Sequence, residues 1–320
     1  MTNNNHVFET SHTHKIDAQK TFGIDAPWPT NSFIQTNEWV PSIDSNYQFD
    51  HATTTSILAG LAHNRRVLVQ GLHGTGKSSH IEQVAARLNW PCLRLNLDSH
   101  MSRSDLLGRD AVVLENGQPI TVFKEGLLPW AMQRPFIVVF DEYDAAQPDI
   151  LFILQRLLES EGKLTLLETN RVITPHPYFR IFATSNTVGL GDLTGLYHGT
   201  NALNQGQMDR WHIVTTLNGL QPEFETAIVA AKVPTLDATQ VRHMVNVANM
   251  TRVGFKAGDL SSLMSPRTVL SWAENSAIFV DTAAAFKLTY LNKCDPAEHG
   301  ILREYYQRCM GVDLVLDDNQ

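Results

Sequence analysis

A glycine-rich loop between an apolar strand and an amphipathic helix limits the fold of this chain more than any other feature. The loop reads Gly71-Leu72-His73-Gly74-Thr75-Gly76-Lys77-Ser78 and directly follows the apolar run 67–69. Residues 77–88 have the apolar spacing of a helix, and residues 92–97 read as a second strand. The order strand, loop, helix, strand predicts the start of a parallel α/β sheet.

The spacing Gly-x4-Gly-Lys-Ser is the complete pattern of a phosphate-binding loop. Glycines let successive backbone N–H groups turn toward phosphate oxygens without a Cβ clash, and the positive end of the next helix points at the same anion. We therefore expect Lys77 to reach the β- and γ-phosphates of ATP and Ser78 to give a hydroxyl ligand to Mg²⁺. The strand before the loop and the helix after it argue against a chance match.

A further apolar strand ends in two neighbouring carboxylates. The run 136–140 is followed by Asp141 and Glu142. At the carboxyl end of a parallel strand, Asp141 can lie beside the loop and hold Mg²⁺, while Glu142 can orient and deprotonate an attacking water. The alternative is a solvated strand end before a helix. The predicted cofactor-binding residues are Gly71, His73, Gly74, Thr75, Gly76, Lys77, Ser78, Ser79 and Asp141, with Ser78 and Asp141 as ligands of Mg²⁺.

Three more polar residues complete the predicted catalytic set with Glu142. Asn186 follows the apolar strand 181–184 and can hold the water or the γ-phosphate. Arg210 is a candidate arginine finger for a neighbouring subunit's site, and Arg267 opens a helix and can report the nucleotide state. An arginine at such a position neutralises charge that develops on the γ-phosphoryl group. For each of the three, a surface or interface salt bridge is the alternative.

The remaining pattern divides the chain into four parts. Residues 1–45 form an extension with little periodicity, of which the first twenty are expected to be disordered. Residues 46–221 form the core, which carries two hairpins, at 111–123 with a turn at Asn116-Gly117 and at 164–173 with a turn near Thr169-Asn170. Residues 222–310 read as helices only, and residues 311–320 are an acidic tail expected to be loose.

Composition limits the compartment and the partners. The net charge of -8 argues mildly against a dedicated nucleic-acid binder, which needs a basic face, so no nucleic acid is expected. The apolar runs are too short to span a bilayer, and the polar N-terminus lacks the apolar segment of a signal peptide, so we expect a cytoplasmic protein with no membrane partner. Three cysteines without zinc-site spacing fit a reducing compartment.

Thirteen histidines raise the question of a metal site. His12 and His14 lie in the polar N-terminal part, His73 lies in the glycine-rich loop, and His100, His176 and His198 are scattered among loop-like segments. None has the paired helical spacing with a carboxylate that a defined site needs. Solvated or structural histidines are therefore the preferred interpretation.

In this order, the residues above make the chain similar to the AAA+ superfamily, in the branch of MoxR-type ATPases and magnesium-chelatase motor subunits. The two hairpins fall where that branch has its helix-two and pre-sensor insertions. The chain resembles most the CobS family, the AAA+ subunits of aerobic cobaltochelatase, over about residues 22–310. The segments that carry the resemblance are Ala62-His63-Asn64-Arg65-Arg66, the glycine-rich loop, residues 80–92, Phe140-Asp141-Glu142-Tyr143-Asp144-Ala145, Asn170-Arg171-Val172-Ile173, Gly195-Leu196-Tyr197-His198-Gly199-Thr200, Leu203-Asn204-Gln205, Asp209-Arg210-Trp211 and residues 263–269.

The resemblance implies more than the residues show. It implies a parallel-sheet αβα sandwich with a smaller C-terminal helical lid domain, and by position it makes Asn186 the first sensor, Arg210 the finger and Arg267 the second sensor. It also implies a homo-oligomeric ring, taken as a hexamer, which uses ATP and Mg²⁺ and works with a CobT-like subunit. Together they would drive a large CobN-like subunit to insert Co²⁺ into hydrogenobyrinic acid a,c-diamide. One departure is Gly219, where the branch has an aromatic residue.

Two other functions stay open on the sequence. The first is a MoxR-like chaperone that remodels another metalloenzyme or complex. The second is a scaffold that binds ATP without turnover, and the complete set of hydrolytic residues argues against it.

Overall fold

The computed structural model describes residues 13–97, 101–187 and 203–314, and these form two compact units. Among these residues, the first unit contains 13–44, 49–71, 77–97, 101–187 and 203–217, and the second contains 45–48, 72–76 and 218–314. The tip of the glycine-rich loop thus groups with the C-terminal helices, whereas the strand before the loop and the helix after it belong to the first unit.

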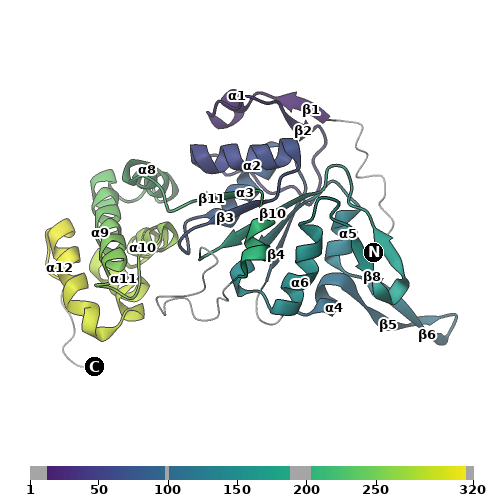
Figure 1. The fold of residues 1–320 in the computed structure, drawn as a ribbon. Helices are drawn as coiled ribbons and strands as arrows, with labels where there is room; N and C mark the ends of the chain where they lie inside the picture. Colours follow the sequence, from purple (N-terminus) through teal and green to yellow (C-terminus); the bar gives the residue numbers. More distant parts are fainter. Residues whose placement is uncertain (1–12, 98–100, 188–202, 315–320) are drawn as a thin grey trace. The chain divides into compact units, whose positions relative to one another are not determined.

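A five-stranded parallel sheet forms the centre of the first unit (Figure 1). Its strands, in spatial order, are β11 (Ile213–Thr216), β3 (Val67–Gln70), β10 (Arg180–Ser185), β7 (Ile137–Asp141) and β4 (Cys92–Asn96). Asn96 pairs with Asp141, and Ser185 pairs with Gln70, so the carboxyl ends of four strands lie at one edge. The predicted parallel α/β sheet is confirmed. Strand β11 was not predicted, because its sequence Ile-Val-Thr-Thr is short and half polar.

Alternate residues of the central strands face two different cores. On β7, Ile137 and Val139 join one core, whereas Val138 and Phe140 join the other. The helices α2 (His51–His63) and α3 (Lys77–Arg87) cover the first face. The helices α4 (Arg103–Leu107), α5 (Leu127–Met132) and α6 (Pro148–Leu157) contribute to the second core. A strand that is buried on both faces reads as a continuous apolar run, which is what the sequence shows at β7.

Local signals set the ends of these helices. Asp50 caps α2 by accepting a hydrogen bond from the Thr53 backbone N–H at 2.8 Å, and Asn64 ends it in the left-handed region at φ 51°. His80 of α3 packs under α2, where its Nε2 lies 2.7 Å from Thr54 Oγ1. Burial lowers the pKa of His80 to about 4, so the ring is neutral near pH 7.

Both predicted hairpins are confirmed. β5 (Gly108–Glu115) pairs antiparallel with β6 (Gln118–Glu125), and Gly117 in their turn has φ 81°, which suits glycine. β8 (Leu164–Leu166) pairs with β9 (Arg171–Ile173). Short helical segments complete the first unit: the 3-10 helices Tyr143–Ala145 and Leu167–Thr169, and α7 (Gln205–Asp209).

The N-terminal part is more ordered than the sequence indicated. β1 (Thr13–Ile16) pairs antiparallel with β2 (Thr30–Phe33), and α1 (Ala18–Phe22) lies between them in the chain. The expectation of disorder is therefore wrong for residues 13–20, while residues 1–12 lie outside the described part. The reason is burial: Phe22, Ile24 and Phe33 are each less than 10% exposed and join the same core as α2 and α3.

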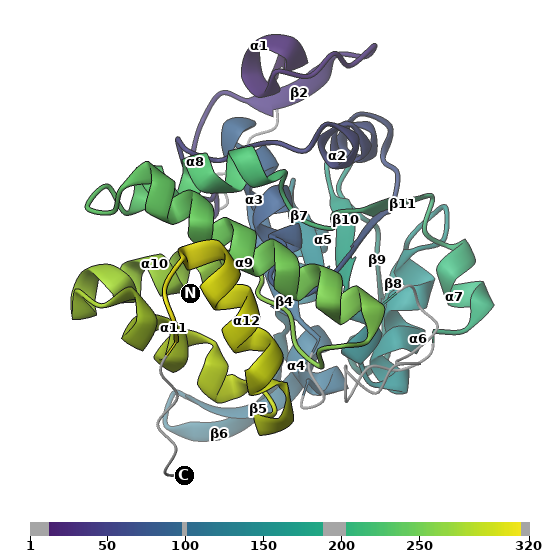
Figure 2. The same cartoon turned by 90° about the vertical axis from the view of Figure 1, so that its left-hand side faces the viewer.

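The second unit is a bundle of helices, seen from another side in Figure 2. Its helices are α8 (Pro222–Lys232), α9 (Ala238–Ala257), α10 (Pro266–Phe279), α11 (Thr282–Thr289) and α12 (His299–Met310), with 3-10 helices at Leu291–Lys293 and Pro296–Glu298. The aromatic rings of Trp272, Phe286 and Tyr306 meet in its core, with centroids 5.0 Å apart for the first two and 4.9 Å apart for the last two. Leu314 is fully buried in the same core, so the expected loose tail does not begin at residue 311.

Within the residues that the structure describes, no helix combines the length and the apolar character needed to cross a membrane.

Gly60 gives a test of the packing between α2 and the sheet, and Gly300 on another helix is its control. A Cβ added at Gly60 of α2 would lie 2.6 Å from Val67 Cγ2 and 3.2 Å from the Arg65 carbonyl oxygen, whereas a Cβ at Gly300 of α12 meets nothing within 4 Å. We expect Gly60→Ala to lower the free energy of unfolding by about 1–3 kcal/mol through overpacking. Gly300→Ala should raise it by up to about 1 kcal/mol through helix propensity. Urea denaturation of both variants measures this, and equal effects would contradict the described packing.

Candidate functional site

The glycine-rich loop joins the end of β3 to the start of α3. The Gly71 N–H donates to the Ser185 carbonyl oxygen at 3.2 Å, which ties the start of the loop to the end of β10. Gly74 and Gly76 have φ of 71° and 88°, values that side chains with a Cβ rarely adopt. Thr75 Oγ1 donates to the Leu72 carbonyl oxygen at 2.9 Å within the tip. His73 and Ser79 are exposed.

The structure brings Lys77 and Asn186 together. The Lys77 side chain is almost buried, with 7% exposed, although it carries a charge. Its Nζ donates to the Gly71 carbonyl oxygen at 2.8 Å and to Asn186 Oδ1 at 2.9 Å. The amine is therefore held between the loop and the end of β10, where it can meet a phosphate group without a large movement.

Asp141 is the best-connected carboxylate of the site. Its Oδ1 accepts hydrogen bonds from Ser78 Oγ at 2.5 Å and from Thr184 Oγ1, and its Oδ2 accepts from two nitrogens of Arg94, with Nε at 2.7 Å. Burial alone raises the pKa of Asp141, but the hydroxyl donors and the Arg94 guanidinium outweigh it, so the pKa lies below its usual range. Asp141 is thus ionised at neutral pH.

A carboxylate and a hydroxyl oxygen 2.5 Å apart are a suitable donor pair for a hard divalent cation. Magnesium prefers oxygen ligands and is held in nucleotide sites by one or two protein groups together with phosphate oxygens. Ser78 lies at the start of the helix that follows the loop, and Asp141 ends the strand beside it. The residues therefore fit Mg²⁺ that arrives with a nucleotide.

Glu142 has an unusual backbone. It lies in the left-handed region at φ 56° and ψ 46°, and its N–H donates to Thr184 Oγ1 at 3.2 Å. This conformation turns the chain at the end of β7 and leaves Glu142 exposed while Asp141 next to it is buried. The adjacent carboxylates of Asp141 and Glu142 thus have different environments. Strained residues of this kind cluster at functional sites.

Asp144 joins the ends of two strands. It is fully buried, and its Oδ2 accepts hydrogen bonds from the Asn186 N–H at 3.1 Å, from the Thr187 N–H at 2.9 Å and from Thr187 Oγ1 at 2.8 Å. The Asn186 side chain also accepts a hydrogen bond from Lys77 Nζ. By holding the backbone of Asn186, the Asp144 carboxylate thus helps to position the side chain that contacts Lys77.

Arg210 is not placed with these groups. It ends α7, and its Nη1 donates to the Gly206 carbonyl oxygen at 2.6 Å. Its Nη2 is 4.0 Å from Glu159 Oε1, and the Gln155 carboxamide, with its oxygen turned toward the guanidinium, accepts at 2.9 Å from both terminal nitrogens. The side chain is 30% exposed. Arg210 is therefore held against α6 and α7.

Arg267 belongs to the second unit. It is the second residue of α10, is exposed, and follows Ser265, whose Oγ caps the helix by accepting from the Thr268 N–H at 3.3 Å. Its helix position matches the predicted one, at the start of a helix in the C-terminal domain.

Reasoning from the sequence missed Arg94, Thr184 and Asp144 as members of the site. The signal for Arg94 was present: the run Cys92-Leu93-Arg94-Leu95-Asn96 alternates, and its polar face includes a charge. Arg94 was overlooked because this strand was interpreted only as an apolar run. Thr184 and Asp144 carry no such signal, because a threonine is common in strands and an aspartate is common after them.

Some of the histidines lie among the described residues. Among the described residues, no three side chains of His, Cys, Asp or Glu come together as a metal site would require. His176 Nδ1 accepts from the Tyr178 N–H at 3.0 Å, and burial lowers its pKa. His12, His100 and His198 lie outside the described residues, as does the segment 195–200 on which part of the resemblance rests.

Comparison with known proteins agrees with this geometry. Residues 66–199 match the model of the AAA domain of the dynein-related subfamily, and residues 225–295 match the CbbQ/NirQ/NorQ C-terminal domain. The chain is 58% identical over 303 residues to the aerobic cobaltochelatase subunit CobS of Sinorhizobium sp, which covers 93% of this chain and 91% of that protein. Protein NorQ of Paracoccus denitrificans is 28% identical over 212 residues, 66% of this chain and 73% of its own.

The fold, the site and these matches define an AAA+ ATPase. Within that class, the chain belongs to the CobS family of aerobic cobaltochelatase subunits. The resemblance inferred from the sequence is thus confirmed, and the alternative of a MoxR-like chaperone is not favoured. Among solved structures, the Thermotoga maritima RuvB branch migration motor has a TM-score of 0.44 at 13% identity, over 83% of this chain and 70% of that one.

The left-handed backbone of Glu142 leads to a prediction about stability. A glutamate in this region has a steric cost of about 1 kcal/mol that glycine avoids. We expect Glu142→Gly to raise the free energy of unfolding by about this amount. Asn170→Gly, at the similar φ of 50°, should give a smaller gain because asparagine tolerates this region. Chemical denaturation tests both, and a destabilised Glu142→Gly would show that the glutamate side chain stabilises the fold.

Proposed function

We propose that the chain is the ATP-hydrolysing motor of an aerobic cobaltochelatase, and that it drives insertion of Co²⁺ into hydrogenobyrinic acid a,c-diamide. The observation that carries the proposal is similarity to CobS over nearly the full length of both chains, together with the contacts that join Lys77, Ser78, Asp141 and Asn186. Co²⁺ and the corrinoid are substrates of the complex, and ATP is the substrate of this subunit.

Binding of ATP is assigned to the glycine-rich loop, from Gly71 through His73, Gly74, Thr75 and Gly76, and to Lys77, Ser78 and Ser79. Backbone N–H groups at positive φ and the start of α3 favour the phosphates. Lys77, already held beside Asn186, would pair with the β- and γ-phosphates. Ser78 and Asp141 would hold Mg²⁺, which when bound neutralises negative charge on the phosphates.

Hydrolysis is assigned to Glu142 and Asn186. The exposed Glu142 carboxylate would accept a proton from the attacking water, because its neighbour Asp141 is committed to Ser78, Thr184 and Arg94. Asn186, fixed by Asp144, would orient the water or the γ-phosphate. The turn at Glu142 gives the two carboxylates different surroundings, so that Asp141 would hold the cation and Glu142 would accept the proton.

Arg210 is assigned to the site of a neighbouring subunit. It contacts Gly206 of α7 and Gln155 of α6, and among the described residues it has no hydrogen bond with Lys77 or Asp141, which suits a finger that acts between subunits. Such an arginine increases the rate of hydrolysis by roughly 10³–10⁵. Arg267 is assigned to the response of the C-terminal helices to nucleotide. A homo-oligomeric ring, taken as a hexamer in the cytoplasm, with a CobT-like and a large CobN-like subunit, completes the proposal.

A cobalt-insertion assay with the CobT-like and CobN-like partners tests the whole function. We expect wild type to insert Co²⁺ only with ATP, and Glu142→Gln to bind ATP but to lose hydrolysis and insertion by about 10²-fold or more. Lys77→Ala should lose binding as well. Glu304→Gln on the exposed side of α12 is the matched control and should behave as wild type. Hydrolysis of ATP without any cobalt insertion would support the ATPase activity but contradict the assignment to a cobaltochelatase.

Mixing two inactive variants tests the place of Arg210. Glu142→Gln subunits have an intact Arg210, and Arg210→Ala subunits have an intact Glu142. If the arginine acts on a neighbour's site, a mixture of the two recovers part of the wild-type ATPase rate, because some interfaces combine both intact residues. Each variant alone should stay inactive. A mixture no more active than the sum of its parts would show that Arg210 does not act between subunits.

A further inference from the structure

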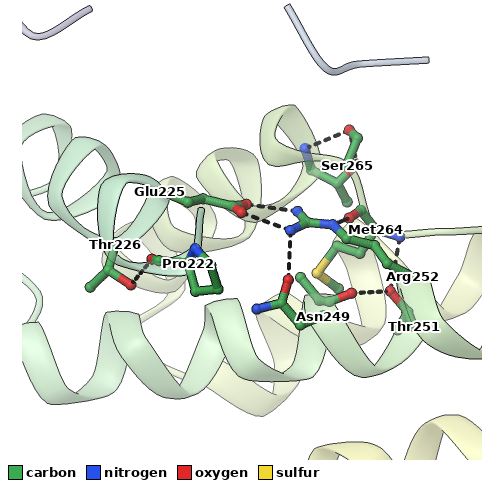
Figure 3. A network of polar contacts seen from close by, with 10 residues as sticks. Pro222, Glu225, Thr226, Asn249, Thr251, Arg252, Met264 and Ser265 are labelled. Atoms are coloured by element: carbon green, nitrogen blue, oxygen red, sulfur yellow. Dashed lines mark hydrogen bonds and ion pairs between the residues drawn. The ribbon is translucent and has the colours of Figure 1, made fainter. Parts of the chain in front are cut away.

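A buried ion pair connects two helices of the second unit (Figure 3). The Glu225 side chain of α8 is 1% exposed and the Arg252 side chain of α9 is 15% exposed. Both carboxylate oxygens of Glu225 accept from the two terminal nitrogens of Arg252, each at 2.7 Å. A two-pronged pair of this kind fixes the direction of the guanidinium as well as its position.

The rest of the guanidinium faces the chain just before α10. Arg252 Nε donates to the Met264 carbonyl oxygen at 2.8 Å, and Nη1 also donates to Asn249 Oδ1 at 2.9 Å. On the other side of the same residue, the Met264 N–H donates to Thr251 Oγ1 at 3.0 Å. Both backbone polar groups of Met264 are thus held by neighbouring side chains of α9, as Figure 3 shows.

Met264 comes directly before the cap of α10. Ser265 is the N-cap residue and Pro266 is the first helical residue, so the direction of the helix start follows from the position of Met264. Arg267 is the next residue. It lies three residues after Met264, whose carbonyl oxygen Arg252 holds, and among the described residues the two arginines share no hydrogen bond.

Ser265 also lies against the tip of the glycine-rich loop. A Cβ added at Gly74 would be 2.4 Å from Ser265 Oγ and 2.6 Å from Ser265 Cβ. Such a contact leaves no room for a side chain, and residues 72–76 group with the helices of this unit. Hydrogen bonds therefore hold Met264 to α9, and Ser265 packs against the loop tip.

We propose that Glu225 and Arg252 are positioning residues for the nucleotide response, which hold the turn 264–267 so that Arg267 and the loop tip keep a fixed arrangement. The inference depends on the proposed role of Arg267 in that response. Glu225 orients Arg252, Arg252 holds the Met264 carbonyl, and Met264 sets the start of α10. Neither Glu225 nor Arg252 is assigned a contact with nucleotide.

A double-mutant cycle separates this role from a merely structural one. Arg252→Met is compared with wild type, and Arg252→Met/Arg267→Ala is compared with Arg267→Ala, by kcat/KM for ATP and by equilibrium binding of a fluorescent ATP analogue. If Arg252 acts through Arg267, its substitution lowers kcat/KM by about tenfold in the wild-type background and by less than about twofold without Arg267. Equal factors in both backgrounds would overturn the proposal.

The matched control is Thr289→Val in the same unit. Thr289 of α11 is 4% exposed, and its Oγ1 accepts from Asn275 Nδ2 at 2.8 Å, a contact with the second half of α10 and not with its start. Its substitution perturbs the core of the unit without touching Met264, so any effect should be the same with and without Arg267. A Thr289→Val effect that disappears with Arg267→Ala would show that general loosening, and not positioning, explains the coupling.

Glu225→Gln keeps the test valid if Arg252→Met does not fold. Glutamine retains the shape and one acceptor oxygen, so Arg252 still reaches Met264 and the loss should be smaller but equally dependent on Arg267. The two hypotheses fail in different ways. A wild type without ATP turnover removes the proposed function, while the binding cycle still shows whether Arg252 and Arg267 are coupled. An active wild type with additive losses removes only the positioning role.

Discussion

The carboxylate of Asp141 is the point on which the arrangement of the site depends. It receives hydrogen bonds from Ser78 at the start of α3, from Thr184 on β10 and from Arg94 on β4, so one side chain at the end of β7 joins four elements. The energetic reason is mutual. A buried carboxylate is costly without donors, and the hydroxyl of the buried Thr184 is costly without an acceptor. The interaction that stabilises this edge of the sheet thus also places the group that would hold the cation.

Much of the fold follows from local signals in the sequence. The run 136–140 is buried on both sides of the sheet, Asn116-Gly117 adopts the positive φ that its residue types favour, and Pro222 begins the first helix of the second unit. Each of these depends on neighbouring residues in the chain. The glycine-rich loop belongs to the same group, because its spacing, with the apolar run before it and the amphipathic segment after it, predicts the order of strand, loop and helix.

The rest depends on contacts between distant residues, which a pattern does not encode. Arg94 reads as a polar residue in a strand until β4 is placed beside β7, where it reaches Asp141. Phe22, Ile24 and Phe33 stand in a polar, irregular segment, and only the apolar surface that they cover explains why that segment is ordered. Arg210 was identified by its position in a motif, but its contacts with Gln155 and Glu159 were not foreseeable from the motif.

The order of the N-terminal segment has a practical consequence for anyone who shortens this protein. A boundary drawn from motifs alone, near residue 46, would cut away β2, whose Phe33 N–H and Ser32 Oγ both donate to the Leu88 carbonyl oxygen at 2.9 Å at the end of α3. It would also uncover the rings of Trp90 and Tyr178, which Phe33 contacts edge-on with centroids 5.1 and 5.7 Å away. Exposed aromatic surface of this kind favours association between molecules. A truncated ATPase would therefore aggregate, and this would mask any change in its catalytic activity.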